Sequence, residues 1–215
     1  MSQRTLNSAK NKAGTNSPKR ATRAPAKKPP RKPTKKVSKA VPPAGTPVPI
    51  DPQKLIDEAK RALESKQGRP RSANLRRAVS TAYYALFHSI CRQAAEHLLP
   101  SASPDHQLRI TRAFGHREIK QVCEWIALRT KTNDNLKPLV DHLKTTSVAD
   151  IAMVFIDLQE ARHDADYNHL EPFSQQSTSA AVVDAELAIK VLRGASLQDR
   201  ELFFALLAIR ARTNG

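Results

Sequence analysis

Apolar residues recur every three or four positions along most of the chain beyond residue 50. This is the spacing at which side chains fall on one face of an α-helix. No stretch alternates apolar and polar residues for long enough to indicate a β-strand. The pattern therefore predicts an all-α fold, a bundle of five or six helices in residues 51–210.

Capping residues locate the ends of these helices. Asp51 is a good N-cap for the first helix, and Ser147 with Asp150 has the spacing of a capping box. Ser196 with Asp199 repeats that spacing before the last helix. The predicted helices are Asp51 to about Gly68, 73–98, 106–130 with a break near Gly115, 147–171, 180–193, and a last helix after Ser196 with apolar positions Phe203, Phe204, Leu206, Leu207 and Ile209. Residues 131–138 are expected to form a loop.

The two cysteines, Cys91 and Cys123, stand alone without a CxxC spacing. Neither a zinc site nor a disulfide framework is indicated, so we expect each thiol to be buried as a small apolar group. This usage is typical of a reducing compartment. No apolar run approaches the length of a membrane span or a secretory signal. The sequence predicts a cytoplasmic protein with no membrane partner.

The net charge of +16 is concentrated in residues 1–50. That segment holds 13 of the 36 Lys and Arg, 9 of the 15 Pro and no acidic residue, while the remainder carries 23 basic against 20 acidic residues. Such a composition predicts a disordered basic tail. It is similar to the tails of linker-histone-like and bacterial nucleoid proteins, and would bind nucleic acid without sequence preference; the alternative is a solubilising tail. The residues predicted to bind are Lys27, Lys28, Arg31, Lys32, Lys35 and Lys36.

Arg162 and His169 are the first candidates for chemistry. The chain has no Gly-rich phosphate loop, no GxSxG and no HExxH, and no two histidines are three or four residues apart, so no metal or cofactor is indicated. On the predicted helix 147–171, Arg162 and His169 would share a face about 10 Å apart along the axis. In one interpretation Arg162 pairs with Asp166 and His169 is half-exposed near the helix end. In the other, Arg162 and His169 face a polar cleft and act together on a phosphodiester.

A second polar group lies on the predicted helix 73–98. Ser80, Tyr84 and His88 are four residues apart and follow the edge of its apolar stripe. Taken alone, this group is more typical of a packed aromatic ring with a hydrogen-bonded hydroxyl than of a functional site.

Two segments together resemble the HEPN superfamily, and most closely its small bacterial branch. They are LRRAVSTAYYALFHSI at 75–90 and LQEARHDADYNH at 158–169, and the similarity extends over roughly residues 51–208. The resemblance implies a helical bundle that dimerises, with a cleft at the dimer seam. In active members an Arg followed by a polar residue and then a His forms a metal-independent ribonuclease site. The corresponding residues here are Arg162, His163 and His169, with six residues between the first and last, at the long end of the family's range.

The residue types suit that activity. Arg162 can bind a phosphate bidentately and stabilise its developing charge. A histidine such as His169 can take the 2′-hydroxyl proton or return one to the leaving 5′ oxygen, and a second histidine is expected from a dimer partner. We expect Asp166 to orient Arg162 or His163, and Tyr167 and Tyr84 to support the site.

The resemblance thus implies a ribonuclease of toxin–antitoxin or defence type, with RNA and a nucleotidyltransferase antitoxin as partners. Two alternatives remain open. One is a non-catalytic HEPN module that binds nucleotide, RNA or a protein. The other is a nucleoid-associated protein that binds through its tail.

Overall fold

The computed structural model describes residues 49–64, 68 and 70–212. These residues contain eight helices and no strand, which confirms the all-α expectation. The helices are α1 (Pro52–Leu63), α2 (Ser72–Leu98), α3 (Pro104–Thr111), α4 (His116–Ala127), α5 (Lys137–Leu143), α6 (Ser147–Tyr167), α7 (Gln175–Gly194) and α8 (Leu197–Arg212). Residues 1–48 of the predicted tail, with all its candidate binding residues, lie outside the described residues.

The expected number of five or six helices was too low for two reasons. The predicted helix 106–130 is divided into α3 and α4, with Gly115 as the N-cap of α4. The short helix α5 was missed because Pro138 and the polar run before it favour a loop, yet Val140 and Leu143 are fully buried. Burial of these two side chains against the bundle outweighs the weak local preference. In addition, α7 begins at Gln175, five residues before the predicted start, because Ser174 accepts from the backbone N–H of Ser177 as its N-cap.

Side-chain caps account for the starts of several other helices. Asp51 accepts from the backbone N–H of Gln53, and Ser196 accepts from that of Asp199, as predicted. For α6 the predicted cap was wrong by one residue. Thr146, not Ser147, is the N-cap, and its hydroxyl accepts from the N–H of Val148 at 3.2 Å.

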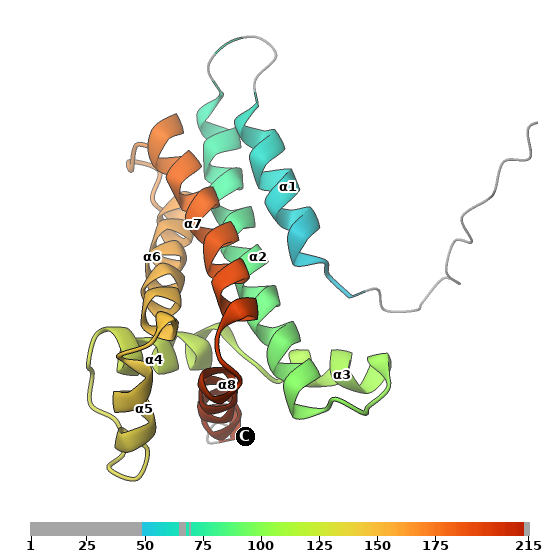
Figure 1. Ribbon diagram of the computed structural model, residues 1–215. Coiled ribbons are helices and arrows are strands. Elements are labelled where there is room, and N and C mark those ends of the chain that lie inside the picture. Colours follow the sequence, from blue (N-terminus) through green and yellow to red (C-terminus); the bar gives the residue numbers. More distant parts are fainter. Residues whose placement is uncertain (1–48, 65–67, 69, 213–215) are drawn as a thin grey trace, which may run out of the picture. The chain divides into compact units, whose positions relative to one another are not determined.

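The long helix α2 is the centre of the packing. It packs against α1, α3, α6, α7 and α8, and Figure 1 shows α1, α2, α6 and α7 running side by side. The helices α4, α5 and α8 pack on one another beside this group, with α4 also against α6. Because α2 touches most of the other helices, residues on its different faces meet side chains that are far away in the sequence.

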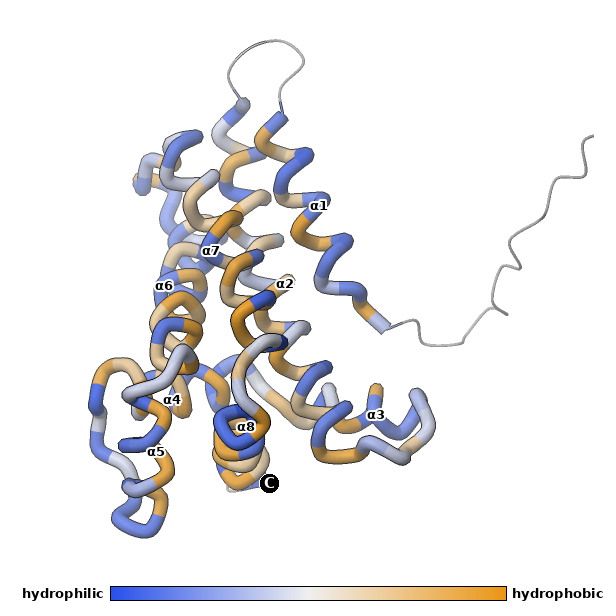
Figure 2. The backbone as a smooth tube through the Cα atoms, viewed as in Figure 1, coloured by the Kyte–Doolittle hydropathy of each residue, from blue (hydrophilic) through white to orange (hydrophobic). Residues whose placement is uncertain are grey.

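One continuous apolar core joins these helices. Phe155 of α6 is fully buried and its ring lies 5.5 Å from that of Tyr83 on α2, which is 1 % exposed. Figure 2 shows apolar positions recurring along the helices between hydrophilic ones. Burying one such large side chain stabilises the fold by about 1.5–3 kcal/mol. Two predicted apolar positions lie outside the core, since Leu98 is 38 % and Ile209 is 43 % exposed.

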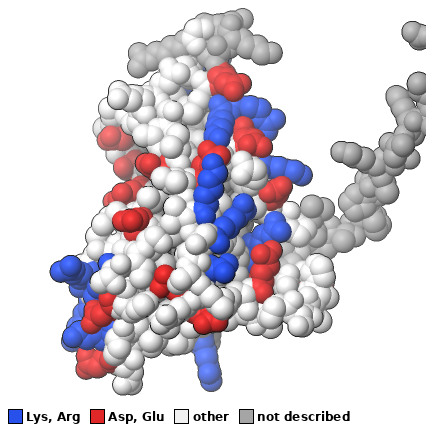
Figure 3. Space-filling model, in the orientation of Figure 1, with Lys and Arg blue, Asp and Glu red and all other residues white. Residues whose placement is uncertain are grey.

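Charges of both signs are interspersed on the face drawn in Figure 3. Lys60 of α1 and Lys190 of α7 both contact the Glu186 carboxylate, at 2.6 and 3.2 Å. Arg77 of α2 pairs with Glu58 of α1 at 2.5 Å. The Lys60–Glu186 and Arg77–Glu58 pairs, both at least partly exposed, help to align α1 with α7 and α2, each contributing no more than about 1 kcal/mol.

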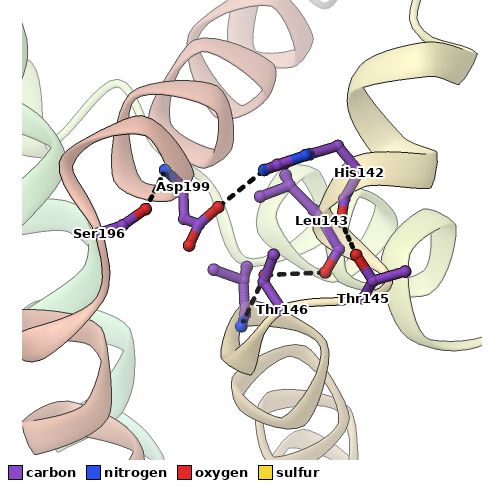
Figure 4. Close-up of polar contacts among 7 residues, drawn as sticks. His142, Leu143, Thr145, Thr146, Ser196 and Asp199 are labelled. Carbon is purple, nitrogen blue, oxygen red and sulfur yellow. Dashed lines mark hydrogen bonds and ion pairs between the residues drawn. The ribbon is translucent and has the colours of Figure 1, made fainter.

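A polar corner joins α5, α6 and α8 (Figure 4). The His142 Nε2 of α5 lies 2.9 Å from the Asp199 carboxylate in the first turn of α8. Thr146 donates to the carbonyl of Leu143, so the end of α5 is bonded to the start of α6. These side-chain hydrogen bonds join the end of α5 to the starts of α6 and α8.

Candidate functional site

The two polar groups identified in the sequence meet along the contact between α2 and α6. Tyr84 contacts Arg162, and one turn earlier on α2, Ser80 contacts Asp166, one turn later on α6. Going from one contact to the next, the residue number decreases on α2 and increases on α6, so the two helices are antiparallel here. Positions four residues apart on each helix therefore form a ladder of polar contacts at the edge of the core.

Arg162 is the centre of this ladder. Its Nη2 donates to the Tyr84 hydroxyl at 2.9 Å, and its Nε lies 2.8 Å from the Asp166 carboxylate. The second contact is an ion pair without hydrogen-bond geometry, since the buried Nε has no hydrogen-bond partner among the described residues. Partial burial by itself lowers the pKa of Arg162, but Tyr84 and Asp166 raise it above its ordinary value. The guanidinium therefore stays charged.

The aromatic rings of Tyr84 and Tyr167 both lie near the Arg162 guanidinium. The Cζ atom of Arg162 is 5.6 Å from the centroid of the Tyr84 ring and 5.8 Å from that of the Tyr167 ring. These distances are those of cation–π contacts. The Arg162 side chain nevertheless remains 24 % exposed, and Nη1 has no hydrogen-bond partner among residues 70–212. The exposed part of the side chain is therefore open to an approaching anion.

Asp166 binds Arg162 through one carboxylate oxygen and Ser80 through the other. The Ser80 hydroxyl donates to Oδ1 at 2.7 Å, while Oδ2 faces Arg162. The pairing of Arg162 with Asp166 is the arrangement that the first interpretation of the spacing predicted. Asp166 thus both orients the guanidinium and neutralises part of its charge.

His169 is not on a helix, contrary to the prediction. The helix α6 ends at Tyr167, so Asn168 to Glu171 form a loop and His169 no longer shares a helical face with Arg162. The Asn168 side chain accepts from the N–H of Leu170 at 3.2 Å, a local turn that competes with helix. Pro172 also disfavours a helical conformation for Glu171. The His169 side chain is exposed.

Arg76 of α2 holds that loop in place. Its guanidinium donates to five backbone carbonyls at the end of α6 and in the loop, those of Asp164, Ala165, Asn168, His169 and Glu171, at 2.7–3.5 Å. The carbonyls at a helix C-terminus have no partner within the helix and carry partial negative charge. Arg76 therefore caps α6 and fixes the backbone of His169, a role that sequence analysis missed.

His163 and Tyr167 lie on the exposed side of α6. Their rings are 5.1 Å apart, and both side chains are exposed. A shallow depression beside them is lined by Lys120, Gln159, Glu160, His163 and Asp164, between α4 and α6. Arg162 does not line it, so this depression is not the cleft that the second interpretation predicted around Arg162.

His116, at the first position of α4, is the neighbour of Arg162 that sequence analysis missed. Its ring lies edge-on to Tyr84 at 5.9 Å and stacks on Phe87 at 3.8 Å. Its Nδ1 is 2.6 Å from the hydroxyl of the buried Tyr83. Burial first, and then the Arg162 guanidinium, lower the pKa of His116, with Glu118 opposing them. No spacing signal could find this residue, since it comes from a different helix.

His88 of α2 belongs to the same cluster. Its ring stacks on Tyr84 at 6.3 Å and meets Phe87 edge-on at 5.1 Å. Burial and then His116 lower the pKa of His88. Three helices thus bring two imidazoles with lowered pKa, a tyrosine and a charged arginine together.

Comparisons with protein-family models, curated proteins and solved structures give no match to this chain. Among the described residues, no group of three or more His, Cys, Asp or Glu side chains is placed to hold a metal ion. No described helix is long and apolar enough to cross a membrane.

Proposed function

We propose that this chain is a HEPN-like, metal-independent endoribonuclease with Arg162 as its phosphate-binding residue. The observation that carries the proposal is the fixed orientation and partial exposure of the Arg162 guanidinium. Tyr84 and Asp166 hold its guanidinium in one orientation, while part of it faces solvent. A planar, oriented guanidinium with available N–H groups suits bidentate binding of a phosphodiester.

In this proposal, the attacking group is the 2′-hydroxyl of the RNA itself. Its oxygen forms a bond to phosphorus as the bond to the 5′ oxygen breaks, which leaves a 2′,3′-cyclic phosphate and a 5′-hydroxyl. Arg162 stabilises the charge that grows on the non-bridging oxygens. His169, exposed in the loop that Arg76 anchors, exchanges a proton with the 2′ or the 5′ oxygen. A homodimer and a nucleotidyltransferase antitoxin remain part of the proposal, by resemblance.

The test is cleavage of an end-labelled RNA in EDTA. We expect wild-type protein to leave 2′,3′-cyclic phosphate ends, and Arg162→Ala and His169→Ala to lower the rate at least about 100-fold. Arg193→Ala and His106→Ala remove an exposed Arg and an exposed His elsewhere, on α7 and α3, and should cleave normally. Helical circular dichroism must match in all variants. Inert wild-type protein at high concentration would exclude the ribonuclease.

Two observations favour a second candidate, a non-catalytic module that binds RNA or nucleotide. Asp166 already neutralises part of the Arg162 charge, and His169 lies beyond the end of α6. A binding module needs Arg162 but not His169. RNA binding that is lost in Arg162→Ala, kept in His169→Ala, and unaccompanied by cleavage would support this candidate instead.

A further inference from the structure

The cluster around Tyr84 places a second imidazole beside Arg162 in the same chain. We propose that the Nε2 atom of His116 contacts the RNA phosphodiester held by Arg162 and takes the 2′-hydroxyl proton. This inference rests on the proposed ribonuclease and deepens it, because it assigns a catalytic residue that neither the sequence motifs nor the family resemblance indicated.

The first argument is that the His116 ring is held in a fixed orientation although part of the residue is open to solvent. The hydroxyl of Tyr83, a residue only 1 % exposed, forms a hydrogen bond with the Nδ1 of His116 at 2.6 Å. Phe87 stacks on the ring face at 3.8 Å. Nδ1 is therefore engaged, and Nε2 is the nitrogen left for a ligand. When Nδ1–H donates to the Tyr83 oxygen, Nε2 is unprotonated, which is the form that a base requires.

The second argument is that His116 and Arg162 share one neighbour. The Tyr84 hydroxyl accepts from Arg162 Nη2 at 2.9 Å, and the Tyr84 ring meets His116 edge-on at 5.9 Å. The charge of Arg162 also acts directly on His116, lowering its pKa after the larger effect of burial. His116 is thus neutral near pH 7 and able to accept a proton. A bound phosphate would offset the Arg162 charge and return the pKa of His116 upward.

The proton balance then closes within one subunit. The 2′-hydroxyl proton passes to His116 Nε2 as the 2′ oxygen bonds to phosphorus. The 5′ oxygen, released as its bond to phosphorus breaks, takes a proton from His169, the other proton-exchanging residue of this mechanism. Both histidines return to their starting states by exchange with water. A histidine from a dimer partner is not needed for this step.

The decisive variant is His116→Asn. The asparagine side chain can keep a polar group near the position of Nδ1, and so retain a bond to Tyr83, but has nothing at the position of Nε2. We expect the single-turnover rate to fall by a factor of about 100–10,000, the usual contribution of a general base, with unchanged circular dichroism. The acid limb of the pH–rate profile should also disappear in His116→Asn.

Titratable and charged groups that face His116 are Tyr83, Tyr84 and His88 on α2, Glu118 on α4 and Arg162 on α6.

A binding readout separates this inference from the proposed function. Full-length protein with labelled histidines is titrated by NMR with and without a 2′-O-methyl RNA oligonucleotide, which cannot be cleaved. We expect the probe to raise the pKa of His116, and Arg162→Gln to abolish the rise. His106 serves as the control imidazole, on α3.

The outcomes are distinguishable. If wild-type protein cleaves RNA and His116→Asn cleaves at the same rate, the inference is overturned while the ribonuclease stands. If wild-type protein is inert but the probe raises the pKa of His116, the ribonuclease and the proton transfer fail and the phosphate contact is supported. If the wild-type protein does not cleave RNA and the probe does not change the pKa of His116, both the ribonuclease and the inference about His116 are overturned.

Discussion

Arg162 is stabilised by partners of different kinds, and each contributes separately to its state. Asp166 supplies charge, the Tyr84 hydroxyl supplies a directed hydrogen bond, and the rings of Tyr84 and Tyr167 lie near the guanidinium. Charge alone would leave the guanidinium free to turn about its side chain. The hydrogen bond to Tyr84, which comes from another helix, sets the plane in which the remaining N–H groups point.

Replacing Tyr84 by Phe therefore tests orientation with little change in shape. The change removes the acceptor of a charge-assisted hydrogen bond, so we expect a loss of about 1.5–3 kcal/mol in the free energy of unfolding, measured in urea. Under the proposed function, RNA affinity should fall as well, because Arg162 loses its fixed plane. Tyr167→Phe is the matched control, since that side chain is 64 % exposed. Equal stability of the two variants would contradict this account of Arg162.

At the scale of single elements, the C-terminus of α6 is determined by a residue on another helix. Arg76 donates to carbonyls before and after the end of α6, including those of Ala165 and Glu171. We expect Arg76→Ala to destabilise the protein by about 2–3 kcal/mol, because several carbonyls lose a charged donor. Its neighbour Arg77 makes one exposed ion pair with Glu58, and Arg77→Ala should cost less than about 1 kcal/mol.

Hydrogen exchange locates the effect of that change. In Arg76→Ala, amide protection should decrease in the last turn of α6 and in residues 168–171, while the first turn of α6 keeps its protection. Uniform loss along α6 would mean that Arg76 acts on the packing of the whole helix and not on its end.

The corner of α5, α6 and α8 predicts a dependence of stability on pH. Hydrogen bonding by Ser196, and more weakly the contact with His142, hold the pKa of Asp199 below its ordinary value. A depressed carboxyl pKa stabilises the fold above the unfolded pKa, near 4, and this contribution is lost as the pH falls through the folded pKa.

We expect Asp199→Asn to lower the free energy of unfolding by about 1 kcal/mol at pH 7. The difference from wild type should shrink as the pH falls below about 4, where the wild-type carboxyl also becomes neutral. Urea unfolding from pH 3 to 7 measures it, with the exposed Asp134→Asn as control. A difference that stays constant over this range would contradict the assignment.

At the scale of the whole described domain, the two thiols report on cooperativity. Cys91 of α2 and Cys123 of α4 are free, buried, and members of the same core. Burial raises the pKa of Cys91 to about 12 and raises that of Cys123 as well. Neither is a reactive thiolate in the folded protein, so labelling by a thiol reagent requires the core to open.

In native buffer we therefore expect Cys91 and Cys123 to be labelled slowly and at the same rate, set by global unfolding. The single-cysteine variants Cys91→Ala and Cys123→Ala allow each rate to be measured separately. Faster labelling of Cys123 would show that α4 opens apart from α2, and His116 would then leave Arg162 during that motion.

The sequence by itself determined the all-α class, the caps Asp51 and Ser196 and the buried cysteines, and it gave the Arg162–Asp166 pair as one of two interpretations. Each depends on local information: an apolar residue at every third or fourth position, a side chain that reaches a backbone N–H two or three residues later, or an i,i+4 pair. The position of α5 and the end of α6 at Tyr167 were not predicted, because they depend on burial and on a guanidinium from α2.

Only the tertiary structure decided which polar residues meet. Tyr84, His116 and Arg162 belong to three helices that are far apart along the chain, and helical periodicity says which face of a helix is buried but not which helix it meets. That choice is made by long-range packing of whole apolar faces around α2. The candidate site at Arg162 could therefore be identified from the sequence, while His116 and Arg76 could be identified only from the fold.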